Sequence, residues 1–411
     1  MQVREFCHAN RKYDAWKPCI TECMSKEAKM QRIKMSVFVM ALIAGQATAG
    51  GESDSNPDPD FGFDFVTIGD VDNIPYPGTI YSLLDSINNA GSVGYEYRIA
   101  RTELTSGQYL EYFNLFLSAD PAEFFTLLPG GDSSLFWVAP GVPLRFESGL
   151  NMPSMSGVQL DWYQAAMFCN WMHNGQSSDR ASLMNGVYDI STFGPIDPDT
   201  GNYPDQPKHH PEARYWIPVL DEYVKAVFYA PNKDGAGPGW WNYGHSSNEP
   251  AVHGLPGNGE VVRDVPIHEL REIFGPAVRL RTVPLGIYTD VQSPWGLLDV
   301  LGGNGEWIED WENSDEGHAR RRLVNPSSNE KDAVFDVVWS LWSQAPENHR
   351  HGLRIASAVR HPADLDKNWV VDWFDVSRFI ELYVAGEMSV DLNADGKLDI
   401  NDVWAYLAIM G

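Results

Sequence analysis

The stretch Ser293–Trp311 reads SPWGLLDVLGGNGEWIEDW and combines three tryptophans, four glycines and four carboxylates. Its apolar residues follow neither the period of a helix nor that of a strand. Each tryptophan can bury roughly 200 Å², and the pair Gly302-Gly303 permits backbone conformations that are closed to other residues. The stretch therefore predicts a long loop, shaped by tertiary packing, inside a large and loop-rich domain.

The chain is long and acidic. Its 411 residues, 12% of them aromatic, suffice for two or three domains with a sizeable core. The formal net charge of −26 argues against nucleic acid as a partner. Cations, neutral glycans and basic protein surfaces are better matched to this charge.

Residues 1–49 predict a targeting segment. A basic patch at 31–34 precedes an apolar run, Met35–Ala44, and the small-residue pattern Ala47-Thr48-Ala49. This order is typical of a secretory signal peptide, and the run is too short to span a membrane. We predict a secreted, periplasmic or cell-surface protein, with Met30 or Met35 as the true start. The alternative is a cytoplasmic amphipathic N-terminus.

Removal of residues 1–49 would leave Cys169 as the single cysteine, because Cys7, Cys19 and Cys23 precede the cleavage signal. No intrachain disulfide is then possible. Cys169 falls in an apolar helical pattern, which predicts a buried and unreactive thiol. Residues 50–60 are rich in Pro and Asp and predict a linker.

Five segments resemble, in order, the sulfatase-modifying-factor domain of the formylglycine-generating enzyme family. PWGLLDV and GEWIEDW resemble the family's PWGLYDMLGNVWEWVEDW. The other similar segments are Arg101–Tyr109, Val158–Trp171, the run from Arg214 through Ala226, and His349–Ala356. The resemblance covers residues 61–358 and implies an α+β, C-type-lectin-like, loop-rich fold.

The same segments carry local predictions. Phe61–Ile68, Tyr95–Ala100 and His349–Ala356 predict strands, and Arg320–Arg322 predict a charged turn. Thr105 or Ser106 would cap a helix that buries Tyr109, Leu110, Phe113 and Leu117. Asp161 would cap a helix with Ala165, Phe168, Cys169 and Met172 on one stripe. A third helix matches the family at Pro218, Glu222 and Ala226, with Val219 where a Thr cap is usual.

Departures from the family pattern bear on function. The family's copper-binding cysteine pair is missing, because no cysteine lies between Gly275 and Ala356, so oxidase activity is not expected. The family's calcium-binding Asn aligns with Gly303, and Asn304 stands one place late. His209-His210 and the pair His349 and His351, which would share a strand face, are possible metal ligands but fit structural roles better.

Two further features have both a functional and a structural interpretation. Trp240 and Trp241 end a Gly/Pro-rich loop and could stack on sugar rings, or simply fill the core. Glu306 and Glu309 could serve as acid and base in an enzyme acting on polysaccharide or sulfated glycan. Their spacing in the sequence does not indicate how far apart the two carboxylates lie across a cleft.

The C-terminus contains two calcium-type loops. The second matches an EF-hand loop that ends in Asp, with Gly396 at the sharp turn, and predicts the ligands Asp391, Asn393, Asp395, Lys397 (through its carbonyl), Asp399 and Asp402. The pattern also occurs 27 residues earlier as Asp364, Asp366, Asn368, Val370 (carbonyl), Asp372 and Asp375. There Trp369 replaces Gly, so the first loop is predicted to bind more weakly. The alternative is a solvated acidic tail.

Residues 362–411, a duplicated loop followed each time by an apolar helix, resemble the dockerin domain. The resemblance implies attachment to a cohesin-like protein or a cell-surface scaffold, with Trp373, Phe374, Ile400 and Asn401 contacting the partner. We predict a secreted, non-catalytic protein that binds a glycan or protein ligand, with calcium as its only cofactor. An extracellular enzyme and a structural surface component are the alternatives.

Overall fold

The structure is a computed structural model. It describes residues 58–82, 85–117, 136–137, 145–146, 160–263, 265–275, 283–302, 304–313, 319–324, 341–347 and 349–410. The chain divides into a larger compact unit, Pro57–Arg360, and a smaller one that contains His361–Gly411. The predicted signal peptide and most of the predicted linker lie outside the described residues, as does Gly303.

A four-stranded antiparallel sheet joins distant parts of the larger unit. Its order is β1 (Phe65–Ile68), β4 (Tyr97–Ala100), β13 (Ala356–Ala358) and β7 (Tyr215–Trp216). The first two strands confirm the predictions over 61–68 and 95–100 in shorter form. The predicted strand over 349–356 is wrong in its bounds, since β13 starts only at Ala356 and His351 bridges Leu160 instead.

A second sheet contains the last part of the stretch that the sequence predicted as loop, from Glu306 onward. Strand β10 (Glu306–Asn313) pairs with β11 (Ala319–Val324), which pairs with β12 (Trp342–Gln344). No two-residue period marks β10, because Glu306 through Glu309 are all buried and the register shifts between Trp307 and Trp311. The predicted charged turn is also wrong: Arg320–Arg322 lie within β11.

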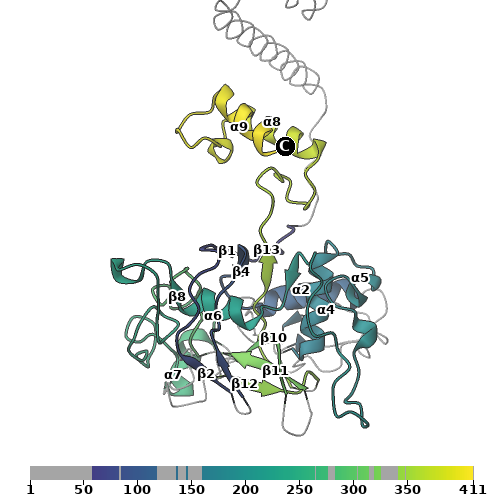
Figure 1. The fold of residues 1–411 in the computed structure, drawn as a ribbon, viewed down its shortest axis with the longest axis vertical. Coiled ribbons are helices and arrows are strands. Elements are labelled where there is room, and N and C mark those ends of the chain that lie inside the picture. The colour runs from purple at the N-terminus through teal and green to yellow at the C-terminus, as the bar shows by residue number, and fades with distance from the viewer. Residues whose placement is uncertain are drawn as a thin grey trace, which may run out of the picture. The chain divides into compact units, whose positions relative to one another are not determined.

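Short elements complete the larger unit. The hairpins are β2 (Thr79–Tyr81) with β3 (Ser86–Asn88), β5 (Phe136–Trp137) with β6 (Arg145–Phe146), and β8 (Tyr229–Ala230) with β9 (Gly239–Trp240). The 3₁₀ turns are η3 (Ile190–Thr192) and η4 (Lys233–Gly235). Figure 1 labels the main elements.

Two helices of the larger unit follow their predicted caps. Helix α2 (Ser106–Leu117) begins after Thr105, whose hydroxyl accepts from the Gln108 amide. Tyr109 and Phe113 are buried as predicted, whereas Leu110 is only half-buried. Helix α4 (Trp162–His173) begins at Asp161, which accepts from the Gln164 amide. It is buried on nearly every side, so the predicted stripe is only part of its packed surface.

Helix α6 (Leu220–Phe228) receives its cap from a distant strand. The N-cap is Val219, whose side chain cannot accept a hydrogen bond. The Leu220 amide instead donates to Asp310 Oδ2 of β10 at 2.6 Å, and the Val219 amide donates to Glu222 Oε2 at 2.9 Å. Asp310 thus takes the place of the missing Thr. Helices α5 (Ala181–Met184) and α7 (Ile267–Phe274), which the sequence did not predict, lie in the connections.

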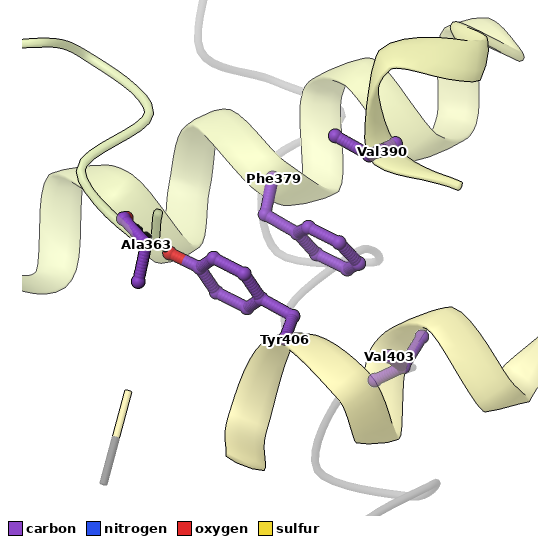
Figure 2. Close-up of a cluster of buried hydrophobic side chains, with 5 residues drawn as sticks. All are labelled: Ala363, Phe379, Val390, Val403 and Tyr406. Carbon is purple, nitrogen blue, oxygen red and sulfur yellow. Dashed lines mark hydrogen bonds between the residues drawn. The ribbon is translucent and has the colours of Figure 1, made fainter. Parts of the chain in front are cut away.

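The smaller unit contains two helices over a small core. Helices α8 (Trp373–Ala385) and α9 (Ile400–Ile409) each follow one acidic loop, with the 3₁₀ turn η6 (Met388–Val390) after α8. The rings of Phe379 and Tyr406 stack with their centres 4.3 Å apart, and Figure 2 shows both rings between the two helices. The Tyr406 hydroxyl donates to the carbonyl of Ala363, which ties α9 to the first loop.

The described part of the chain is a mixed α and β protein with seven α-helices and small antiparallel sheets. None of the helices within the described ranges is both long and apolar enough to cross a membrane.

Candidate metal centre

Three carboxylates of the first C-terminal loop come together. Asp364, Asp366 and Asp375 each place one oxygen so that all three oxygens lie within 4.8 Å of one another. Asp364 and Asp375 are buried and Asp366 is half-buried. They occupy positions 1, 3 and 12 of the predicted loop, and converging oxygens are the ligands that Ca²⁺ takes in loops of this kind.

One oxygen of this group lacks a partner. Asp364 is 6% exposed, and its Oδ2 accepts from the Trp369 amide at 2.8 Å. Its Oδ1 is buried without any hydrogen bond. Burial raises the pKa of Asp366, and the charges of Asp375, Asp364 and Asp372 add to that effect. A cation would satisfy the unpaired oxygen and relieve the mutual repulsion.

Asp375 connects the loop to the helix that follows it. Its Oδ1 accepts from the amides of Leu365 (2.7 Å) and Asp366 (3.1 Å), and its Oδ2 accepts from the Asp372 amide at 2.8 Å. Asp372, a predicted ligand, accepts from the Phe374 amide and is the N-cap of α8. The last carboxylate of the loop is therefore fixed from both sides by backbone donors.

The second loop has the same connections but a more open arrangement. Asp402 accepts from the amides of Asn393 and Asp399, and these backbone donors lower its pKa. Asp399 is the N-cap of α9, and Asp391 accepts from the amides of Asp395 and Gly396. No trio of carboxylates within 391–402, a fully described segment, comes within 4.8 Å. The sequence favoured this loop, whereas the structure brings carboxylates together in the other.

The backbone of the two loops matches. The fourth positions, Lys367 and Ala394, have φ of 61° and 54°, and the sixth positions, Trp369 and Gly396, have φ of 71° and 80°. Trp369 thus adopts the left-handed conformation that Gly396 takes without steric cost. At the seventh positions, Val370 and Lys397 are exposed, as are Asn393 and Asp395 of the second loop.

The predicted partner-contacting residues lie at the surface beside the loops. Trp373 is 48% exposed, Phe374 68% and Ile400 47%, and Asn401 is also exposed. Each pair occupies the first turn of its helix, between the ninth and twelfth loop positions. Trp373, Phe374 and Ile400 therefore place large apolar side chains directly next to the acidic loops.

The tryptophan pair of the larger unit does not form an open platform. Trp240 is buried, with its ring against Tyr76 and Tyr229 at 5.7 and 5.1 Å. Trp241 is half-buried, and the Lys233 ammonium lies 4.3 Å from its ring centre. Trp240 thus lies in the core, which agrees with the packing role that the sequence also allowed, and its role in ligand binding stays a prediction.

The two members of each histidine pair have different surroundings. His209 contacts Glu309, whereas His210 is exposed. His349 is exposed, while the His351 ring lies edge-on to Trp307 at 4.9 Å. Within the described ranges, no group of three metal-binding side chains includes a histidine.

The carboxylates that the sequence offered as acid and base, Glu306 and Glu309, are buried and form hydrogen bonds and ion pairs with core residues. Glu306 forms a two-fold ion pair with Arg354, at 2.9 and 3.0 Å. Glu309 accepts from the Tyr188 hydroxyl and from the amide of His209. Cys169 is fully buried and its thiol pKa is raised by desolvation, as the sequence predicted.

Sequence reasoning missed the buried cations. Arg321 pairs with Asp205, Arg322 with Asp85, and Arg354 with Glu306. Arg321 also lies between two indoles, 3.6 Å from Trp162 and 4.7 Å from Trp311. The one available signal was the number of carboxylates in SPWGLLDVLGGNGEWIEDW, since a buried carboxylate requires a cation nearby.

Comparison with known proteins does not assign a family to this chain. The chain matches no family model and no curated protein. Among solved structures, CarF has 16% sequence identity and a TM-score of 0.41, covering 73% of this chain and 99% of its own. PvdO from Pseudomonas aeruginosa has 15% identity and a TM-score of 0.35, covering 72% and 92%. At these values neither protein assigns a family or an activity to this chain.

Proposed function

We propose that this chain is a secreted, calcium-dependent attachment protein. Its smaller unit is a dockerin-like module that folds around calcium and docks to a cohesin-like protein or cell-surface scaffold. Its larger unit is a sulfatase-modifying-factor-like domain that binds a glycan or a protein ligand without catalysis.

The observation that carries the proposal is the group formed by Asp364, Asp366 and Asp375. Three carboxylates each place an oxygen within 4.8 Å of the others, and Asp364 also has a buried oxygen without a partner. This arrangement is unfavourable without a cation. Oxygen-only ligands of this kind suit Ca²⁺ better than a transition metal. Calcium would offset most of the negative charge of these carboxylates and hold the loop against the first turn of α8.

The docking role rests on the surface next to the loops. Trp373, Phe374 and Ile400 expose apolar surface at the helix starts, and these starts are fixed by Asp372, Asp375, Asp399 and Asp402. Large aromatic side chains are enriched at the centres of protein interfaces. The proposed partner therefore has an apolar depression with a basic rim.

The non-catalytic role of the larger unit rests on its chemistry. Its single cysteine in the described ranges, Cys169, is buried within α4. Glu306 and Glu309 are held by Arg354, Tyr188 and His209. With Trp240 in the core, the half-buried Trp241 remains as the aromatic candidate for ligand contact.

The test is a calorimetric titration of calcium into the chelator-treated chain. We expect two sites with Kd of about 10⁻⁵ to 10⁻³ M. Asp364→Asn should remove the first-loop site and Asp391→Asn the second, whereas Asp199→Asn, at an exposed position of the larger unit, should change neither. Absence of calcium heat in the native chain, with magnesium as the ionic control, would overturn the proposal.

A further inference from the structure

A segment of the larger unit, 205–209, is held against β10 and β11 by buried charges. Arg321 donates to Asp205 Oδ2 at 2.8 and 3.0 Å and to the carbonyl of Gln206 at 2.7 Å. At the other end, the amide of His209 donates to Glu309 Oε1 at 2.7 Å. Both Asp205 and Glu309 are almost fully buried.

His209 is the titratable residue of this contact. Its Nδ1 lies 2.9 Å from Glu309 Oε1, and its ring stacks on Trp216 with centres 4.8 Å apart. The side chain is 19% exposed. Nδ1 faces Glu309, and the partly exposed ring leaves Nε2 as the nitrogen that can exchange a proton with solvent. A proton can therefore enter and leave while the Glu309 contact stays in place.

The balance of buried charge depends on that proton. Glu309 and Asp205 bring two negative charges and Arg321 brings one positive charge. Protonated His209 makes the group neutral, and neutral His209 leaves one unbalanced negative charge in the core. The other charged groups acting on His209 are Glu222 of α6, which favours the proton, and Lys208, which opposes it. Tyr188 donates to the same Glu309 oxygen.

We propose that His209 and Glu309 form a proton-operated clamp that fastens the segment 205–209 to β10. At acidic pH the imidazolium balances Glu309 and the clamp is closed. As the pH rises and the proton leaves, the buried negative charge is uncompensated and the segment opens more often. Burial lowers the pKa of His209, but its hydrogen bond to Glu309 and the charges of Glu309 and Glu222 together raise it by more. The device does not involve the calcium loops.

The sign of the effect follows from linkage. A group whose pKa is raised on folding stabilises the closed state fully below its unfolded-state pKa, and this stabilisation is lost as the pH rises through the folded-state pKa. Loosening is thus expected from near-neutral pH upward.

Hydrogen exchange tests the clamp on the full chain. Protection factors for amides of the segment 205–209, corrected for the intrinsic pH dependence of exchange, are measured from about pH 5 to about pH 9, the range that spans histidine titration. In the native chain we expect them to fall as the pH rises. In His209→Gln the fall should disappear, whereas His210→Gln, a change of the exposed neighbour, should keep it.

A second measurement follows the protonation of His209 directly. The ring signal of His209, followed by NMR, should titrate above the ordinary midpoint of about 6.5, and Glu309→Gln should lower the midpoint. A midpoint at or below the ordinary value in the native chain would overturn the proposal. Protection factors that do not change with pH, or that change equally in His209→Gln, would also overturn it.

Discussion

Glu103 is an acidic residue that is buried in the core of the larger unit. The residue is 1% exposed and its Oε1 is buried without a hydrogen bond. Desolvation raises its pKa well above the usual value, and the Glu306 charge raises it further, while Arg354 lowers it. Arg354 is already paired with Glu306. Burial therefore favours the protonated form of Glu103 in the folded protein.

We predict that Glu103→Gln stabilises the larger unit at alkaline pH. A carboxyl whose folded pKa is raised favours folding at low pH, and this advantage is lost as the pH rises above its unfolded pKa. Gln keeps the shape without that loss, so the variant should gain on the order of 1 kcal/mol near pH 8 and little near pH 4. Urea unfolding at both pH values measures the difference. Glu272→Gln, an exposed change on α7, is the control, and an equal gain there would contradict the prediction.

Trp369 carries the second prediction at this scale. Its φ of 71° is costly for a residue with a Cβ, whereas Gly396 occupies the matching position freely. Trp369→Gly should therefore tighten calcium binding by the first loop by about 1 kcal/mol, or roughly fivefold. Gly396→Ala should weaken the second loop. Calcium titration of both variants checks the pair, and unchanged affinity in both would contradict the strain argument.

At the scale of elements, the start of α6 depends on Asp310 of β10. The carboxylate accepts from the Leu220 amide, and burial raises its pKa. We predict that Asp310→Ala costs about 1 kcal/mol of unfolding free energy. Val219→Thr in the same background should recover part of the loss, because Thr can cap the helix locally. Chemical unfolding of the single and double variants measures this, and no recovery in the double variant would argue against capping.

Local signals in the sequence were sufficient to predict several helices. The caps Thr105 and Asp161 and the spacing of the two acidic loops placed α2, α4, α8 and α9. These predictions succeeded because each depends on residues within a few positions of one another.

The features that the sequence did not predict correctly depend on residues that are distant in the sequence. Strand β10 is buried on both faces, which removes the alternation that marks a strand. Arg321 and Arg322 were predicted in a charged turn, but they are buried and pair with Asp205 and Asp85, which lie more than a hundred positions away in the sequence. The same holds for the contact between His209 and Glu309, which no local pattern indicates.

At the scale of the whole molecule, the two units have different sources of stability. The larger unit has buried ion pairs and an extensive aromatic core, including Trp162, Trp171 and Trp307. The smaller unit has a core of five buried residues, with Phe379 stacked on Tyr406 at its centre. A domain of this size usually needs a disulfide or a metal ion in addition. Its acidic loops are the natural place for that contribution.

This difference leads to the last prediction, which concerns calcium removal. Scanning calorimetry of the full chain should show two transitions, of which only that of the smaller unit moves with calcium. At a concentration of about 100 times Kd, one site adds roughly 2.7 kcal/mol, which for a small domain raises Tm by more than about 10 °C. Chelator should reverse the rise, and Asp375→Asn should reduce it because Asp375 joins the loop to α8. A shift of the larger unit's transition instead would place the calcium there, and the smaller unit would then have to fold on its apolar core alone.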